Sequence, residues 1–261
     1  ETPFFTVEFD EKTGGIKSVI DKETKINYIA EGKLANQFLL YEDRSIQYPA
    51  WDIQLYHREM QIESPVLDSF QFNDDHVNIN YHIKRNGDES SGKDCFTSTI
   101  NQTITFSPNE PFIDFRTLVN WTQHDKHMKV SFPTDIRSRY ARYGIQFGNL
   151  LRATHNNTKR DMAKFEVFGR WCDLAEQDRG VSLMSDIKSG FDVHESEIKM
   201  SLLKAAMIED QWEDFGQRKF TYRAVFHRGT FTESKIQDIH TDLITPPVLT
   251  TKNEQSQHGK L

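Results

Sequence analysis

The chain contains two alternating stretches, Thr99-Ile-Asn-Gln-Thr-Ile-Thr-Phe106 and Phe112-Ile-Asp-Phe-Arg-Thr-Leu-Val-Asn-Trp121, joined by Ser107-Pro-Asn-Glu-Pro111. Apolar and polar residues alternate in both stretches, which is the pattern of β-strands that bury one face. The short proline-containing connection predicts that the chain turns back on itself, so that the two strands pair as an antiparallel hairpin. This part of the sequence therefore favours an antiparallel β architecture.

The same alternation extends to both sides of this hairpin. A second hairpin is predicted for 5–20 around Gly14-Gly15, and a third for 70–83 around Asn73-Asp74-Asp75. Further strands are expected at 180–184, 199–203 and 220–226. Strands at such short spacing predict antiparallel sheets that pack face to face.

Helical periodicity is confined to one segment, 233–243, which Pro246-Pro247 would end. A parallel α/β fold would need helical crossovers of a dozen or more residues, and the sequence indicates none. The sequence therefore predicts an all-β fold, a large antiparallel β-sandwich over 1–245 with one short helix near its end. The polar stretch 85–94 is expected to be a surface loop, and 246–261 a linker-like tail toward a further C-terminal domain.

Composition narrows the classes of function. The 261 residues carry a net charge of −7, with 27% charged and 12% aromatic residues. An acidic chain is a poor partner for nucleic acid, and no apolar run reaches the roughly 20 residues that span a membrane. The two cysteines, Cys95 and Cys172, exclude a disulfide scaffold and a cysteine-based metal cluster. They are typical of a reducing compartment, or of a single bridge.

Polar and aromatic residues are densest between 152 and 176, where Arg152, His155 and Asp161 precede Trp171. Such side chains can line a sugar subsite, because carboxylate and guanidinium groups bind hydroxyls and an indole ring covers the apolar face of a hexose. The alternative is a long ordered loop whose polar groups satisfy its own backbone.

Trp51 and Asp52 form a second candidate site. A tryptophan beside a carboxylate is a common sugar-binding pair, because it combines a stacking face with a hydrogen-bond acceptor. The alternative is a tryptophan buried in the core that is followed by an aspartate in a turn, which would give the same dipeptide. The residues alone leave these two interpretations open.

A third cluster consists of His124, Asp125 and His127. Its spacing is compatible with metal ligation. No cysteine or distant third ligand is indicated, and the positive charges of Lys126 and Lys129 disfavour a divalent cation. The segment is therefore predicted to be a solvated turn between two strands rather than a metal site.

Three segments carry a resemblance to a known family: Arg152-Ala-Thr-His-Asn-Asn-Thr158, Ala163-Lys-Phe-Glu-Val167 and Arg170-Trp-Cys-Asp-Leu-Ala-Glu176. Together they resemble a signature of the α-mannosidases of glycoside hydrolase family 38, in the branch that includes cytosolic and vacuolar enzymes. Further segments follow in family order, so the resemblance extends from Pro3 to Gly229. One departure is Ser189, which stands where the family has an aromatic ring that could stack on a sugar.

The resemblance implies a fold and an activity for the intact protein. It implies a sandwich related to galactose-mutarotase-like folds, which closes one side of the active site of a zinc-dependent, retaining exo-mannosidase. The substrate would be a mannose-containing oligosaccharide. The chain opens at Glu1 with strand-like sequence and no initiator methionine, so it is expected to be part of a longer protein.

The zinc ligands and the nucleophilic carboxylate are expected on an N-terminal α/β barrel that precedes Glu1. No catalytic residue and no metal ligand is therefore expected in this chain. The resemblance implies that the candidate residues lie at the substrate rim or brace the interface with the barrel; they are Trp51, Asp52, Arg152, His155 and Asp161. The branch implies a cytoplasmic enzyme, or a vacuolar one in a fungus.

Two other functions fit the same residues. A stand-alone carbohydrate-binding module of lectin-like type would bind mannose without any partner domain. An epimerase of the mutarotase-like fold would need a paired histidine and glutamate as acid and base, for which His227 and Glu166 can be nominated. The long ordered run of family-like segments favours the mannosidase part over both.

Overall fold

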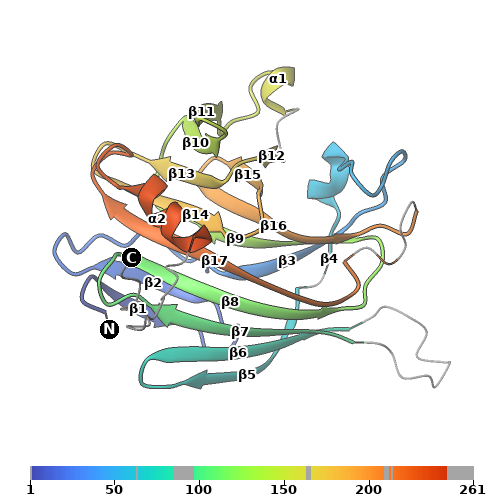
Figure 1. The fold of residues 1–261 in the computed structure, drawn as a ribbon, viewed down its shortest axis with the longest axis horizontal. Helices are drawn as coiled ribbons and strands as arrows, with labels where there is room; N and C mark the ends of the chain where they lie inside the picture. The colour runs from blue at the N-terminus through green and yellow to red at the C-terminus, as the bar shows by residue number, and fades with distance from the viewer. Residues whose placement is uncertain are drawn as a thin grey trace, which may run out of the picture.

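The computed structural model of the chain describes residues 2–62, 64–84, 97–162, 166–208, 212 and 214–245. The stretch predicted to be a loop, 85–94, and the predicted tail, 246–261, lie outside these residues. Every strand pairing within the described residues is antiparallel, and the strands form three sheets (Figure 1). The predicted all-β, antiparallel architecture is confirmed.

The largest sheet has nine strands. In spatial order they are β11 (Gly148–Ala153), β10 (Tyr140–Ile145), β13 (Trp171–Ala175), β14 (Arg179–Ser185), β17 (Gly216–Arg228), β8 (Phe112–Trp121), β7 (Ser98–Phe106), β6 (His76–Ile83) and β5 (Val66–Phe72). The hairpins predicted at 70–83 and 99–121 are β5–β6 and β7–β8, and they join into one meander. Local alternation was sufficient to predict them because hairpin partners are neighbours in sequence.

The second large sheet has six strands and carries the segments of interest for function. In order they are β12 (Val167–Phe168), β15 (Gly190–His194), β16 (Glu197–Ala205), β9 (Lys126–Pro133), β3 (Gln37–Glu42) and β4 (Gln61–Ile62). The hairpin predicted at 5–20 forms a separate pair, β1 (Phe5–Phe9) with β2 (Ile16–Asp21). The helical elements are η1 (Leu55–Glu59), α1 (Lys159–Met162) and α2 (Ile236–Ile244).

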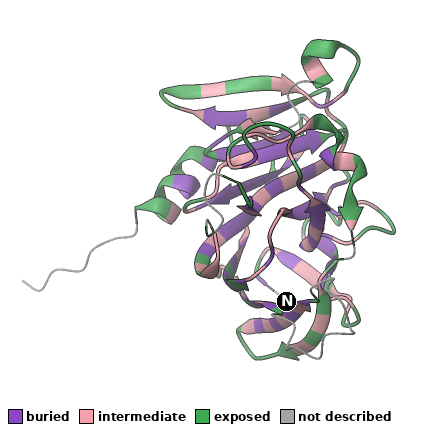
Figure 2. Ribbon diagram, turned by 90° about the vertical axis from the view of Figure 1, so that its right-hand side faces the viewer, coloured by how far each residue is buried: buried purple, intermediate pink, exposed green. Residues whose placement is uncertain are grey.

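The two large sheets pack face to face through aromatic side chains. Phe115 of β8 lies edge-on against Phe132 of β9, with ring centroids 5.7 Å apart. Phe38 of β3 meets Tyr81 of β6 in the same way at 5.5 Å. In Figure 2, buried residues run along the strands in the middle of the molecule, whereas α1 is largely exposed and β11 has no buried residue. The apolar core therefore lies between the sheets, as a sandwich requires.

Polar side chains also cross this core. The Asn36 amide donates to Gln102 Oε1 at 2.7 Å, and the Tyr222 hydroxyl donates to Asn36 Oδ1. The Gln102 amide in turn donates to Thr117 Oγ1 at 3.0 Å and to the Tyr222 hydroxyl oxygen at 2.8 Å. The four residues are buried, so this network supplies hydrogen-bond partners that water cannot.

Helix α2 covers part of the outer face of the nine-stranded sheet. Its buried residues Ile236 and Ile239 pack with Trp171, Met184 and Val225. The sequence predicted a start near residue 233, but the helix begins at Ile236. The reason is local, because the Glu233 carboxylate accepts hydrogen bonds from Thr230 and so holds a turn before the helix. None of the helices in the described ranges has the length and apolar content needed to cross a membrane.

Gly144 on β10 leaves room for the indole of Trp171. A Cβ at Gly144 would lie 2.4 Å from Nε1 and 2.5 Å from Cε2 of that ring, which is only 3% exposed. Gly144→Ala is therefore expected to lower the free energy of unfolding by about 2 kcal/mol, because the ring must move within a packed site. Urea denaturation measures the effect.

Gly148 provides the matched control, since a Cβ there meets open space. Gly148→Ala is expected to change the free energy of unfolding by no more than about 0.5 kcal/mol. Equal effects of the two substitutions would contradict the packing argument.

Candidate functional site

The segment 43–60 joins β3 to β4 and carries the first two candidates. Trp51 is 68% exposed, and its indole stacks on the Tyr48 ring with centroids 5.5 Å apart and an interplanar angle of 18°. The Asp52 carboxylate accepts a hydrogen bond from the Gln54 amide at 2.7 Å. Trp51 is therefore not a core residue, and the alternative of a buried tryptophan is excluded. Sequence reasoning missed Tyr48, although it stands only three residues before Trp51.

Two basic side chains attach this segment to the six-stranded sheet. Lys204 of β16 forms an ion pair with Asp43 and donates to the Pro49 carbonyl at 2.5 Å. Arg58, within η1, donates from Nη2 to Asp192 Oδ1 of β15, also at 2.5 Å. Burial raises the pKa of Asp43 despite the opposing effect of Lys204. The contacts leave Trp51 between two points of attachment.

The segment from β11 to α1 carries the other three candidates. The Arg152 guanidinium lies 5.9 Å from the centroid of the Tyr143 ring. His155 Nδ1 is 3.7 Å from Asp161 Oδ2. The same carboxylate oxygen accepts a hydrogen bond from Thr158 Oγ1 at 2.7 Å, and Thr158 Oγ1 accepts one from the Asp161 amide. Thr158 and Asp161 thus form a capping pair at the start of α1.

The structure brings Arg152, His155 and Asp161 into one segment and places Trp51 and Asp52 in another. Among the described residues, no hydrogen bond, ion pair or ring contact joins the two sets. Both segments project from the upper side of the molecule in Figure 1, where α1 is labelled and the short blue helical turn above β4 is η1.

The prediction of one long loop or subsite over 152–176 is wrong for its second half. Trp171 and Asp173 belong to β13, and both are buried. Asp173 Oδ1 accepts hydrogen bonds from Ser182 at 2.5 Å and from His227 at 2.9 Å. A buried aspartate in a strand has the same sequence signature as an aspartate in a loop, so the strand was not recognised.

A buried ionic cluster lies between the two segments, on the face of the six-stranded sheet that points away from the core. Lys129 of β9 forms an ion pair with Glu166, which follows α1, and lies 3.7 Å from Asp192. The Lys129 side chain is 1% exposed and that of Asp192 is 3% exposed. Ser201 of β16 donates from its hydroxyl to Glu166 Oε1. Sequence reasoning saw Lys129 only as a charge that disfavours a metal.

His127 lies beside this cluster on the same face of β9. Its Nε2 is 2.8 Å from Ser201 Oγ. Ser201 has one proton and donates it to Glu166, so His127 donates from Nε2 to Ser201 and its Nδ1 is the unprotonated nitrogen. Nδ1 is buried and has no hydrogen-bond partner among the described residues. His127 is therefore buried within a strand, and the prediction of a solvated turn is wrong at this residue.

A second buried histidine, His57 of η1, packs against His127 with ring centroids 5.6 Å apart. Burial, followed by the positive charge of Lys129, lowers the pKa of His57 to about 4. The same two causes lower the pKa of His127 well below its ordinary value. Both rings are therefore neutral near pH 7, and they add no charge to the ionic cluster.

The His124–His127 segment does not form a ligand set. The His124 ring packs against Phe215 with centroids 4.2 Å apart, and Asp125 Oδ1 accepts a hydrogen bond from the Met207 amide. His127 faces Ser201, so the three donors point to different neighbours. Within the part of the chain that the structure describes, no group of three His, Cys, Asp or Glu side chains could hold a metal ion.

The residues nominated for an epimerase are not brought together. His227 pairs with Asp173 inside the nine-stranded sheet, and Glu166 pairs with Lys129 on the six-stranded sheet. An acid–base mechanism needs both groups within reach of one substrate. The geometry of the two residues therefore gives no support to this alternative.

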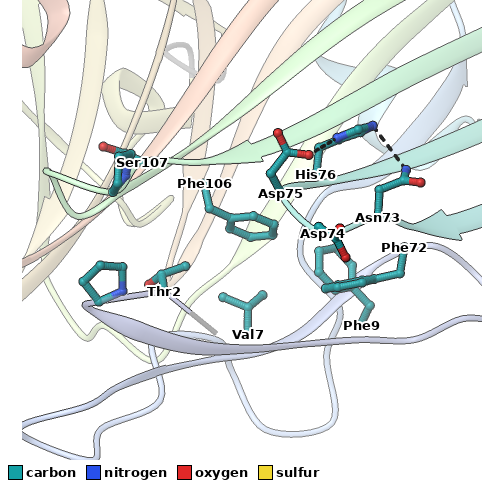
Figure 3. A pocket seen from close by; sticks show the side chains of 12 residues that line it. Thr2, Val7, Phe9, Phe72, Asn73, Asp74, Asp75, His76, Phe106 and Ser107 are labelled. Atoms are coloured by element: carbon teal, nitrogen blue, oxygen red, sulfur yellow. Dashed lines mark hydrogen bonds and ion pairs between the residues drawn. The ribbon is translucent and has the colours of Figure 1, made fainter.

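A small pocket of about 220 Å³ lies apart from all five candidates, between β1, the β5–β6 turn and the end of β7 (Figure 3). Val7, Phe9 and Phe106 form its apolar side. The His76 ring hydrogen-bonds Asp75 at 2.6 Å and Asn73 at 3.2 Å. These three polar groups thus bind one another, and we assign the pocket no ligand.

Known proteins match this sequence and fold. The family described as "Glycosyl hydrolases family 38 C-terminal domain" matches residues 1–211. The chain is 36% identical over 231 residues to Alpha-mannosidase 2C1 of Mus musculus, covering 86% of this chain and 21% of that protein. It is 32% identical over 241 residues to Alpha-mannosidase of Saccharomyces cerevisiae, covering 88% and 22%. The chain thus spans about a fifth of the length of the curated relatives it matches.

A solved structure supports the fold independently. The crystal structure of an alpha-mannosidase from Enterococcus faecalis superposes with a TM-score of 0.75, covering 94% of this chain and 31% of that one at 13% sequence identity. At this identity the likeness concerns the fold alone, whereas the match over residues 1–211 concerns the sequence. The chain therefore belongs to glycosyl hydrolase family 38 and corresponds to its C-terminal domain.

Proposed function

We propose that this chain is the β-sandwich part of a zinc-dependent, retaining α-mannosidase that hydrolyses terminal α-mannosides of oligosaccharides. The observation that carries the proposal is the match of residues 1–211 to the family, together with curated relatives that are α-mannosidases about four times as long. The remaining part of such an enzyme would be an N-terminal barrel with the nucleophile and the zinc. The sandwich would occupy 1–245, and 246–261 would lead to a further domain.

Zinc chemistry is assigned to the barrel rather than to this chain. The described residues of the chain offer no group of three ligands, and the donors at 124–127 diverge. When bound, zinc would polarise the region of the glycosidic bond that breaks and would orient the hydroxyls of the sugar. The chain itself would contribute binding surface, and we assign it no catalytic residue.

The proposed contribution of this chain is a substrate rim made by the two projecting segments. Trp51 offers an exposed ring stacked on Tyr48, and Asp52 offers a carboxylate beside it. An aromatic face with an adjacent acceptor suits the apolar face and hydroxyls of a hexose. Arg152, His155 and Asp161 would serve as further rim residues or as a brace against the barrel.

Trp51→Ala in the intact enzyme is expected to lower kcat/KM for a mannose disaccharide about tenfold, which corresponds to about 1.4 kcal/mol of transition-state binding. Steady-state kinetics measures the loss. Phe147→Ala is the matched control, because Phe147 is a fully exposed aromatic residue on the β10–β11 hairpin. An equal response of the two variants would contradict the rim assignment.

The 261-residue chain alone is expected to hydrolyse no aryl α-mannoside and to bind mannobiose too weakly for titration calorimetry. The reason is that the proposed active site closes only against the barrel. Turnover by the purified chain that a chelator abolishes would overturn this assignment. Binding of mannobiose without turnover would favour the carbohydrate-binding module instead.

A cytoplasmic location, or a vacuolar one in a fungus, is also part of the proposal. Its support is the cytosolic and vacuolar branch that the sequence resembles and the low cysteine content. Cys172 is a free, buried thiol, as is usual in a reducing compartment. Localisation of the tagged intact protein by microscopy tests it.

A further inference from the structure

We propose that Lys129 is a positioning residue. Through one shared ionic cluster it holds in place both rim segments, the one that carries Trp51 and the one that carries Asp161. The role of the two segments as a substrate rim rests on the proposed function. The tethering of the segments is inferred from the ion pairs and hydrogen bonds alone. The Lys129 side chain is only 1% exposed, so we assign it no contact with a sugar. Its role would be to fix two connecting segments to the same sheet.

The first tether leads to the segment that carries Trp51. Arg58 lies in η1, and its guanidinium binds Asp192 Oδ1 at 2.5 Å. The other carboxylate oxygen of Asp192 faces Lys129 at 3.7 Å. Asp192 therefore links Arg58 of the segment to Lys129 of the sheet. Arg58 and Asp192 are 134 positions apart in the sequence.

The second tether leads to the segment that carries His155 and Asp161. Glu166 follows α1 and forms an ion pair with Lys129 through Oε2, while Oε1 accepts the Ser201 hydroxyl. Gly190 on β15 provides the space for this carboxylate, because a Cβ there would lie 2.8 Å from Glu166 Oε1. The carboxylate is thus fixed by a charge, a hydrogen bond and a close backbone approach.

The charges of the cluster balance only when Lys129 is present. Lys129 and Arg58 supply two positive charges, and Glu166 and Asp192 supply two negative ones. His57 and His127, the histidine rings that border the cluster, are neutral near pH 7 because burial and the charge of Lys129 lower their pKa values, and burial raises the pKa of the neighbouring Tyr41. Without the lysine, Glu166 would lose the cation it pairs with and Asp192 would keep Arg58, in a site where the Asp192 side chain is only 3% exposed.

A buried ionic cluster is seldom the most stabilising use of such positions, because apolar side chains avoid the cost of desolvating charges. What charged groups add is orientation, since each hydrogen bond fixes a direction as well as a distance. β9 is flanked by β3 and β16 and so offers a rigid base. Two segments that are far apart in sequence are thereby held to one strand.

Hydrogen–deuterium exchange of the full 261-residue chain tests the tethering. Arg58→Met is expected to accelerate exchange at least tenfold in 54–60 only. Glu166→Gln is expected to do so in 154–162 only, and Gly190→Ala should have the same effect because it displaces the carboxylate without removing a charge. Lys129→Met is expected to accelerate both segments, and Lys129→Arg to restore part of the protection.

Strand β7 is the internal control, because its exchange reports a general loss of stability rather than a local release. If Lys129→Met does not fold, the Arg58→Met and Glu166→Gln variants still test the two tethers separately. Unchanged exchange in both segments of any folded Lys129→Met protein would overturn the inference. So would equal acceleration of both segments by Arg58→Met alone.

Kinetics of the intact enzyme separates this inference from the proposed function. If Lys129 positions Trp51, the Trp51→Ala substitution should lower kcat/KM about tenfold in the wild type and by less than about twofold in a Lys129→Met background. Accelerated exchange with unchanged kcat/KM would leave the tethering in place and refute the rim. A loss of kcat/KM in Trp51→Ala with additive effects in the double variant would support the rim and overturn the positioning role.

Discussion

Gln102→Leu is expected to lower the free energy of unfolding by about 3 kcal/mol, although leucine has nearly the same volume. The Gln102 amide holds Asn36, Thr117 and Tyr222 together across the core. Without it, the Asn36 amide group and the Thr117 hydroxyl oxygen lose a partner in a region that water does not reach. Each buried polar group left without a partner costs about 1–3 kcal/mol.

Asn101→Leu is the matched control, since Asn101 is the preceding residue of β7 and points to the exposed face. It is expected to change the free energy of unfolding by no more than about 0.5 kcal/mol. Urea denaturation at pH 7 measures both variants. If Gln102→Leu is as stable as Asn101→Leu, the network adds nothing beyond its volume, and the prediction is wrong.

The sandwich could be predicted from sequence because its strongest signals are local. The alternation at 99–106 and 112–121 needs only a short turn to specify β7 and β8, and the structure pairs them residue by residue. The fold class followed from several such hairpins. The start of α2 was displaced by three residues because a side-chain turn at Thr230 competes with the first helical turn.

The candidate site was predictable only in part, because its connections are long-range. Trp51 and Asp52 could be singled out by residue type, and the exposure of Trp51 in a projecting segment agrees with that choice, while contact of either residue with a sugar stays a prediction. Lys129 could not be recognised, since a lysine in a strand ordinarily indicates a solvated face. Its partners lie 37 positions away at Glu166 and further still at Asp192, so no local pattern contains them.

The same limit explains the error at His127. Polar neighbours in sequence suggested water, but the ring is covered by η1 and by Ser201 of the adjacent strand. Buried histidines of this kind have a measurable consequence, because they must be neutral in the folded protein.

Acidification from pH 7 to pH 4 is expected to lower the free energy of unfolding by about 3 kcal/mol through His57 alone. The folded-state pKa of His57 is about 4, below its ordinary value of about 6.5 in the unfolded chain. Above pH 6.5 both states are neutral at this ring, and the full stability is present. As the pH falls toward 4, His57 binds a proton in the unfolded state but remains largely neutral in the folded state, so the free energy of unfolding decreases.

His127 acts in the same direction, because burial and the charge of Lys129 also lower its pKa. Urea denaturation at a series of pH values from 7.5 to 4 measures the slope, and His57→Gln should make it shallower by about one proton below pH 6. His194→Gln is the control, since His194 is exposed on β15, and it should leave the slope as in the wild type. A slope unchanged by His57→Gln would mean that the ring accepts a proton in the folded state. His57 would then carry a positive charge in mild acid beside Lys129, Glu166 and Asp192. The net charge of the ionic cluster and its border would therefore depend on pH.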